Sequence, residues 1–259
     1  PFAGATRRMT DRLRIAHCAD IHLDASGYGQ ALGAEGSAFH RDAFDRALAA
    51  MLAHGPDMML LAGDLFDSNR ATTASIEWAM ARLAALPGPV LMIPGNHDCL
   101  ETGSIYHRYD FAALPNVQIM LAHDGEVVRV PELGVACWGR GMVEHHRLFS
   151  PLGGLPLRPE GCRWYLAMGH GLFVPHGGDT DRSSPIHMRE VEASPCDYIA
   201  LGHHHAAMEL APENEPGRVL AAYAGSPTDK VGRGPTYIIA DLAAGALPAV
   251  VVHAVTEGW

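Results

Sequence analysis

The chain has 259 residues, of which 48% are hydrophobic, and its formal net charge is −10. This apolar content is enough for a buried core, whereas the negative charge argues against a protein that coats nucleic acid without selectivity. The sequence carries neither a signal-peptide pattern nor an apolar run long enough to cross a bilayer, and its five cysteines are an odd number without CxxC spacing. We therefore expect a cytoplasmic protein with reduced thiols and no membrane segment.

The first hundred residues alternate between strand and helix patterns. Short apolar runs predict strands at residues 13–19, 58–62 and 90–93, and apolar residues at helical spacing predict helices at 37–54 and 73–86. A Gly-Pro pair ends the first helix and a Pro-Gly pair ends the second. This alternation is typical of an α/β fold.

The rest of the chain is predominantly strand. Three short strand patterns separated by turn residues predict a meander in the middle, and two continuous apolar strands and three closing strands follow. We expect one domain over residues 9–259, with strands in two sheets and helices outside, and a disordered or cloning-derived extension at residues 1–8. The predicted strands lie at 117–121, 126–130, 135–138, 164–168, 198–201, 219–223, 236–241 and 250–255.

Seven residues with metal-ligating side chains stand at or just after the ends of predicted strands. In α/β sheets, groups at these positions converge on a crevice beyond the carboxyl ends of the strands. A glycine directly before a ligand lets the chain turn sharply and keeps bulk away from an ion. The mixture of carboxylate, amide oxygen and imidazole suits a pair of divalent transition ions, and such pairs cleave phosphate esters. The seven candidates are Asp20, His22, Asp64, Asn96, His170, His203 and His205.

In its full order of motifs the chain resembles the calcineurin-like metallophosphoesterases. Three segments are also similar to the SbcD-type DNA-repair exonucleases of that superfamily: Ala-Asp-Ile-His-Leu at 19–23, Ala-Gly-Asp-Leu-Phe-Asp at 62–67 and Tyr-Ala-Gly-Ser-Pro at 223–227. The resemblance implies a two-sheet αββα sandwich with a dinuclear metal site at the carboxyl ends of the strands. It further implies that Asp64 bridges two ions, one completed by Asp20, His22 and His205 and the other by Asn96, His170 and His203.

His97 follows a candidate ligand without being needed as one, so it is the candidate general acid for the leaving oxygen. Asp67 would hold His97 in the correct tautomer, as its counterpart does in the phosphatase relatives, although some repair nucleases carry histidine at that position. Arginines in loops after strands are candidate phosphate contacts, and we single out Arg70, Arg108 and Arg140.

Three functions fit these observations. We expect a metal-dependent phosphodiester hydrolase that acts as a DNA nuclease in repair, with two ions that lower the pKa of a shared water. A phosphodiesterase for a small substrate, such as a cyclic nucleotide or a nucleotide-linked metabolite, is favoured by the acidic charge and compact length. An inactive metal-binding or protein-binding module is disfavoured, because such a module has no need of His97.

The cofactors and partners follow from the same resemblance. We expect manganese in both sites, since the resembling nucleases favour it, while iron, zinc and cobalt would also suit these ligands. DNA is the expected partner. A stable partnership with an ATPase is not expected, because no capping or docking region is evident. The loops that carry His145, His146 and His176 would be able to reach a substrate.

Overall fold

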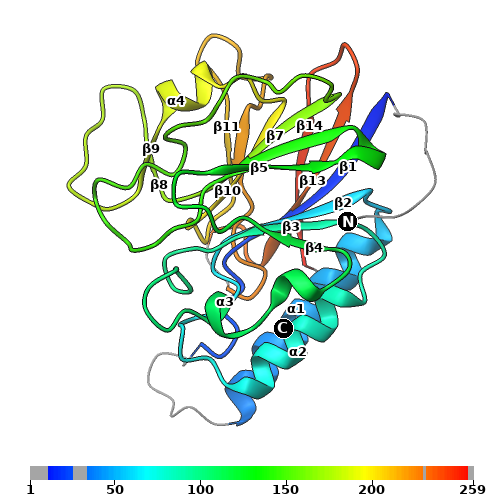
Figure 1. The fold of residues 1–259 in the computed structure, drawn as a ribbon. Coiled ribbons are helices and arrows are strands. Elements are labelled where there is room, and N and C mark those ends of the chain that lie inside the picture. The colour runs from blue at the N-terminus through cyan, green and yellow to red at the C-terminus, as the bar shows by residue number, and fades with distance from the viewer. Residues whose placement is uncertain (1–10, 26–33, 230–231, 256–259) are drawn as a thin grey trace.

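The computed structural model describes residues 11–25, 34–229 and 232–255 (Figure 1). The expected extension at residues 1–8 lies outside the described residues. Within them, two six-stranded sheets face each other, and a two-stranded sheet lies beside the second. The α/β expectation and the two-sheet sandwich are confirmed.

The first sheet has the strand order β14-β13-β1-β2-β3-β4. Its four N-terminal strands are parallel neighbours, and the two C-terminal strands extend it in antiparallel fashion from β1. The strands are β1 (Arg12–Cys18), β2 (Met58–Ala62), β3 (Val90–Ile93), β4 (Val117–Ile119), β13 (Thr236–Ala243) and β14 (Ala249–Ala254).

The second sheet has the order β11-β12-β10-β7-β6-β5. Four parallel strands form its centre, and β5 and β11 pair in antiparallel fashion at its two edges. The strands are β5 (Glu126–Val130), β6 (Val135–Gly139), β7 (Trp164–His170), β10 (Tyr198–Gly202), β11 (Met208–Leu210) and β12 (Ala221–Tyr223), with β8 (Leu172–Val174) and β9 (Pro185–His187) in the small sheet.

The predicted meander is wrong. The strand β4 pairs in parallel with β3 in the first sheet, whereas β5 and β6 form an antiparallel pair in the second sheet. The turn between β4 and β5 therefore carries the chain from one sheet to the other. Short strands separated by turns look alike whether they remain in one sheet or change sheets, because the alternation of apolar residues records burial and not the partner strand.

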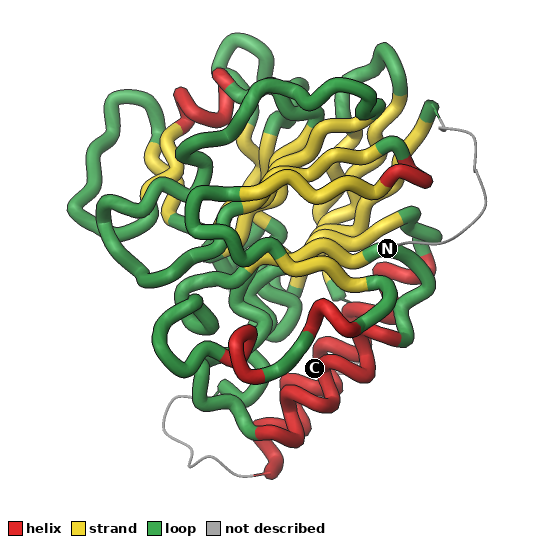
Figure 2. The backbone as a smooth tube through the Cα atoms, in the orientation of Figure 1, coloured by secondary structure: helices red, strands yellow, loops and turns green. Residues whose placement is uncertain are grey.

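Apolar side chains fill three layers around these sheets. Between the sheets lie residues such as Leu60, Leu91 and Leu166, all fully buried. Against the outer face of the first sheet pack α1 (Ala34–Ala53) and α2 (Thr73–Ala84), which lie alongside each other in Figures 1 and 2.

The outer face of the second sheet has a thinner cover. The short helix α4 (Met188–Ala193), the small sheet and long loops lie over it, as the tube in Figure 2 makes plain. The remaining helical turns are α3 (Ile105–Arg108) and two 3₁₀ turns, Phe111–Ala113 and Pro131–Leu133. In the described part of the chain, no helix is long and apolar enough to cross a membrane. All five cysteines are free, as expected for reduced thiols.

Candidate metal centre

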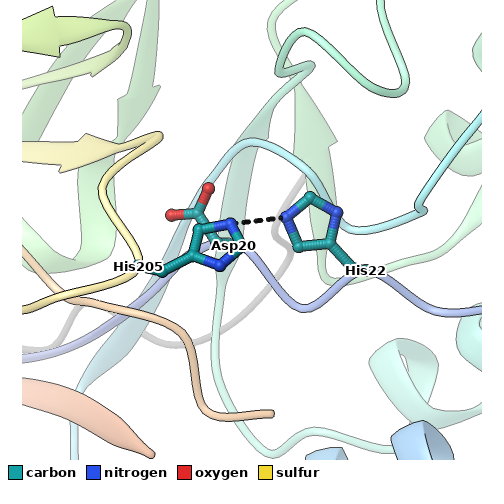
Figure 3. Close-up of side chains that lie close together, drawn as sticks. All are labelled: Asp20, His22 and His205. Atoms are coloured by element: carbon teal, nitrogen blue, oxygen red, sulfur yellow. Dashed lines mark hydrogen bonds between the residues drawn. The ribbon is translucent and has the colours of Figure 1, made fainter. Parts of the chain in front are cut away.

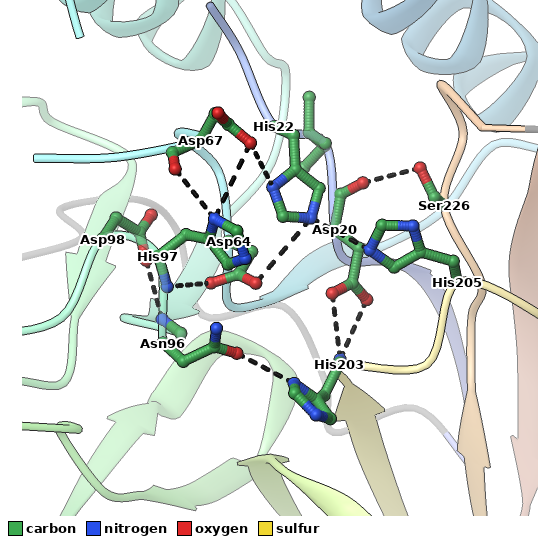
Figure 4. A network of polar contacts seen from close by, with 12 residues as sticks. Asp20, His22, Asp64, Asp67, Asn96, His97, Asp98, His203, His205 and Ser226 are labelled. Atoms are coloured by element: carbon green, nitrogen blue, oxygen red, sulfur yellow. Dashed lines mark hydrogen bonds and ion pairs between the residues drawn. The ribbon is translucent and has the colours of Figure 1, made fainter. Parts of the chain in front are cut away.

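The structure brings all seven candidate ligands together at the carboxyl ends of five strands, and Figure 4 labels all of them except His170. Four of them come from the first sheet: Asp20 and His22 follow β1, Asp64 follows β2, and Asn96 follows β3. The other three come from the second sheet, where His170 ends β7 and His203 and His205 follow β10. The centre therefore lies across the seam between the two sheets.

Three overlapping groups of side chains are close enough to hold an ion. In each group the potential ligand atoms lie within 4.8 Å of one another. The amide oxygen of Asn96 adds a further meeting point, 3.0 Å from Nε2 of His170 and 2.8 Å from Nδ1 of His203. The three groups are Asp20 with His22 and His205, His22 with Asp64 and His97, and Asp20 with Asp64 and His170.

The hydrogen bonds of His170 show that this arrangement fits a cation. Its Nδ1 lies 2.8 Å from the carbonyl oxygen of Ala62 and must donate to it, because a carbonyl only accepts. Nε2 faces two acceptor atoms, Oδ1 of Asn96 at 3.0 Å and Oδ2 of Asp64 at 3.3 Å. Without a metal, a proton on Nε2 satisfies both oxygens; a divalent ion would replace that proton and be held by the same three atoms.

His22 and His205 present the same pattern from opposite sheets. Their Nε2 atoms lie 3.1 Å apart, with the carboxylate of Asp20 beside them (Figure 3). Behind the His22 ring, Nδ1 lies 3.3 Å from Oδ1 of Asp67. A carboxylate behind an imidazole is the usual support for a metal-bound histidine.

The backbone at the centre is strained. Of the six non-glycine residues with positive φ in the described part of the chain, four are candidate ligands: Asp20 (55°), His22 (51°), Asp64 (53°) and His203 (100°). Such conformations cost of order 1–3 kcal/mol each and persist where the surroundings enforce them, commonly at functional sites.

Glycines beside the ligands allow the strands to approach closely. A Cβ atom on Gly63 would overlap the ring of His170, and one on Gly95 would overlap the carboxylate of Asp64. A Cβ atom on Gly202 would overlap the carbonyl oxygen of Ala62. The sequence expectation that these glycines keep bulk away from the site is therefore confirmed at three positions.

Burial and charge together perturb the ionisable groups of the centre. Burial lowers the pKa of His170, but the neighbouring carboxylate of Asp64 outweighs this effect and raises the pKa to about 9. Burial raises the pKa of Asp64, but the charge of His170 has the opposite effect and holds this pKa below the usual range. Burial raises the pKa of Asp20, and burial together with the charge of His170 lowers the pKa of His203 to about 3. Because Asp20 and Asp64 are buried, their negative charges need nearby positive charges to be stable.

His97 lies at the solvent side of the centre. Its backbone N–H donates to Oδ1 of Asp64 at 2.9 Å, and its ring lies edge-on to His22 with 4.6 Å between the centroids. Nδ1 of His97 is 2.8 Å from the backbone carbonyl oxygen of Asp67 but 3.7 Å from the Asp67 carboxylate. The hydrogen bond that orients His97 is thus made by the main chain of Asp67, while the carboxylate lies nearer to His22 (Figure 4).

The three arginines singled out as phosphate contacts have different environments. Arg108 donates to the carbonyl oxygens of Gly103 and Asn69, at 3.0 and 2.7 Å. Arg140 donates to three carbonyl oxygens and lies over the ring of Phe149, so it holds a loop together. The guanidinium of Arg70 makes no hydrogen bond or ion pair with any described residue.

Four supporting residues were not identified from the sequence as part of the site. Asp98 is fully buried and accepts from the backbone N–H groups of Gly95 and Phe66, which orders the loop that carries His97. The others follow β12, and the only local signal is their Gly-Ser-Pro turn after a strand. They are Ser226, Thr228 and Asp229, which hydrogen-bond to the segment carrying Asp20 and to His205.

His145, in the loop after β6, lies beside the centre. Its Nε2 lies 2.7 Å from the hydroxyl of Ser183, and its ring centroid lies 5.7 Å from that of His203. This exposed side chain is therefore the member of the three loop histidines that the structure places beside a candidate ligand. His176 instead pairs with Glu192.

A two-sheet sandwich with carboxylate, amide and imidazole groups gathered at its strand ends is the architecture of a metal-dependent phosphoesterase. The sequence profile of the calcineurin-like phosphoesterases matches residues 13–207, and the chain belongs to this family. Family membership implies divalent metal ions as cofactors, and the donor atoms described above fit such ions.

Two curated relatives differ in their described roles. The chain is 28% identical to the DNA double-strand break repair protein Mre11 of Saccharolobus solfataricus over 83% of this chain and 54% of that protein. It is 33% identical to a probable cyclic nucleotide phosphodiesterase of Pseudoalteromonas sp. over 35% of this chain and 33% of that protein. The chain spans between about a fifth and just over half of the length of these curated relatives.

One solved structure supports the fold. It superposes with a TM-score of 0.54 at 11% identity, covering 95% of this chain and all of the other. At this identity the likeness concerns the fold alone. The expected resemblance to the metallophosphoesterases is confirmed, and the similarity to Mre11 over most of the chain agrees with the resemblance to the repair exonucleases.

Proposed function

We propose that this protein is a metal-dependent nuclease that hydrolyses phosphodiester bonds of DNA. The observation that carries the proposal is the convergence of seven ligating side chains beside His97, in a chain similar to Mre11 over 83% of its length. We further propose that residues 9–259 form one domain, because the apolar core between the sheets joins strands from both ends of the chain.

In the proposed assignment, Asp64 is shared between two ions. One ion would be held by the residues around Asp20 and the other by those around Asn96, and we propose manganese for both. Bound ions would supply Lewis-acid activation of water and neutralise charge that develops on the phosphate. The full sets are Asp20, His22 and His205 for the first ion, and Asn96, His170 and His203 for the second.

His97 is the proposed general acid. Its Nδ1 donates to the main-chain carbonyl of Asp67, so Nε2 is the nitrogen that faces the substrate; the imidazolium form, with a proton on each nitrogen, would pass the Nε2 proton to the leaving oxygen and become neutral. The side chain of His97 is exposed, which suits this role because the DNA substrate must approach the centre from solvent. We propose that Asp67 acts on His97 through this carbonyl and on His22 through its carboxylate.

We propose two side chains in loops that follow the strands as substrate contacts. Arg70, whose guanidinium is free of described partners, would pair with a phosphate, and His145 would contact the phosphate beside His203. Arg108 and Arg140 are weaker candidates, since backbone carbonyls already occupy their donors.

A small phosphodiester is the second candidate substrate. The similarity to a probable cyclic nucleotide phosphodiesterase and the net charge of −10 favour it. Binding to DNA would be expected to weaken steeply as salt rises, whereas a small substrate with one phosphate would show a shallow dependence.

Cleavage of labelled single-stranded DNA, linear and circular, in the presence of Mn²⁺ tests the proposal. We expect metal-dependent cutting of the linear strand that is absent from Asp64→Ala, and cutting of the circle would assign endonuclease action. If neither is cut while the same preparation hydrolyses an activated aryl phosphodiester, the DNA proposal is wrong and the small substrate takes its place.

A further inference from the structure

Asp229 lies directly behind one of the candidate ligands. Its Oδ2 is 2.8 Å from Nδ1 of His205, while Nε2 of the same ring points to Nε2 of His22 at 3.1 Å. Both side chains of the pair are partly exposed, so the contact is made at the rim of the centre and not in the core. The His205 ring therefore lies between Asp229 at Nδ1 and His22 at Nε2. Figure 3 shows the side of the ring that faces His22 and Asp20.

This contact selects the tautomer of His205. A carboxylate only accepts hydrogen bonds, so the proton of the neutral ring resides on Nδ1 and the lone pair of Nε2 faces Asp20 and His22. That is the form in which imidazole binds a metal ion. The carboxylate of Asp67 lies on the corresponding side of the His22 ring, with Oδ1 3.3 Å from Nδ1.

The turn that carries Asp229 is hydrogen-bonded to the segments that carry the candidate ligands. The hydroxyl of Ser226 donates to the carbonyl oxygen of Asp20 at 2.7 Å, and that of Thr228 donates to the carbonyl oxygen of Ile21 at 2.9 Å. The backbone N–H of Ser226 donates to the carbonyl oxygen of His205 at 3.0 Å. Three hydrogen bonds therefore fix the position of Asp229 relative to the ligands of one ion.

We infer that Asp229 is a positioning residue that orients His205 for metal binding and thereby sets the affinity of the site formed by Asp20, His22 and His205. The inference rests on the proposed function, since it requires that these residues hold an ion. The inference adds to the seven candidate ligands a supporting residue that does not itself bind the ion. This residue lies after β12, outside all of the motifs used to recognise the family.

Metal binding by the metal-free protein provides the test. Titration with Mn²⁺ in a calorimeter should resolve two sites in the wild type, and Asp229→Asn should weaken one of them by about 10- to 100-fold. The asparagine amide can donate to Nδ1 and so place the ring proton on Nε2. Asp229→Glu should recover part of the affinity, because it restores an acceptor-only partner.

Glu209→Gln is the matched control. Glu209 is a partly exposed carboxylate that pairs with Arg233, away from the ligands, and its loss should leave both sites unchanged. The visible spectrum of the Co²⁺-loaded protein gives a second readout, because a reoriented imidazole changes the ligand field without requiring a change in thermal stability.

The two hypotheses fail in different ways. Wild-type protein that binds neither Mn²⁺ nor Co²⁺ would contradict the proposed function. Two ions bound by Asp229→Asn with wild-type affinity and an unchanged Co²⁺ spectrum would overturn the role of Asp229 alone. An equal loss in Glu209→Gln would also overturn it, because the effect would then be one of general charge.

Discussion

His17 makes the stability of this protein sensitive to mild acid. The side chain is fully buried on β1, between the sheets, where Nδ1 lies 2.9 Å from the hydroxyl of Tyr198. Burial lowers the pKa of His17 from 6.5 to about 3 in the folded protein. Between these two values the unfolded chain binds a proton at this position and the folded protein does not. Stability is therefore lost as the pH falls below 6.5 and the loss ends near pH 3.

The size of the effect follows from the two pKa values. At pH 5 the unfolded side chain lies about 1.5 pH units below its pKa while the folded one is still neutral, which corresponds to about 2 kcal/mol of stability. For a protein of ordinary stability, this is a large share of the total free energy of unfolding.

Urea unfolding of metal-free protein at pH 7 and pH 5 measures this contribution. His17→Gln retains a group that can bond to Tyr198 but does not titrate, so its loss of stability between the two pH values should be about 2 kcal/mol smaller than that of the wild type. His107→Gln, at an exposed histidine, serves as the control. An identical pH dependence in the wild type and His17→Gln would refute the reasoning.

Three further predictions concern the metal centre. Asp64→Ala should lose both ions and all metal-dependent cleavage, measured by metal analysis and the DNA assay; substantial turnover would contradict its bridging role. His97→Ala should keep both ions but cleave DNA about 10²- to 10⁴-fold more slowly, with a smaller loss for an activated aryl diester, and equal losses would argue against a general acid. Gly95→Ala should weaken Mn²⁺ binding in calorimetry, because the new Cβ overlaps the carboxylate of Asp64, whereas Gly217→Ala, at a position with open space, should not; matching affinities in the two variants would refute the steric argument.

The strand ends could be predicted from the sequence because two signals coincide there. Apolar runs define β2 and β3, and a glycine followed by a ligating side chain comes directly after each run or one residue later. Since parallel strands present their carboxyl ends at one edge, the convergence of Asp64 and Asn96 follows without knowledge of the loops. The remaining candidate ligands could be assigned because the order of the motifs resembles that of the metallophosphoesterases.

The assignment of strands to sheets could not be predicted, because it depends on contacts across the core. The transfer of the chain between β4 and β5 leaves no mark in the local pattern of apolar residues. For the same reason Arg108 and Arg140 looked like phosphate contacts: nothing in the sequence shows that backbone carbonyls bind their guanidinium groups. Asp229 was missed because its partner, His205, lies 24 residues earlier in the sequence.

The position of the candidate ligands across the seam would link metal binding to the docking of the two sheets. Because Asp20 and His22 lie on one sheet and His205 on the other, an ion held by all three would bind only the docked state. Free metal at about 100 times its dissociation constant would add roughly 2.7 kcal/mol to the stability of that state. The linkage is reciprocal, so a cavity cut into the core between the sheets, for instance by Leu166→Ala, would loosen the ions without touching a single ligand.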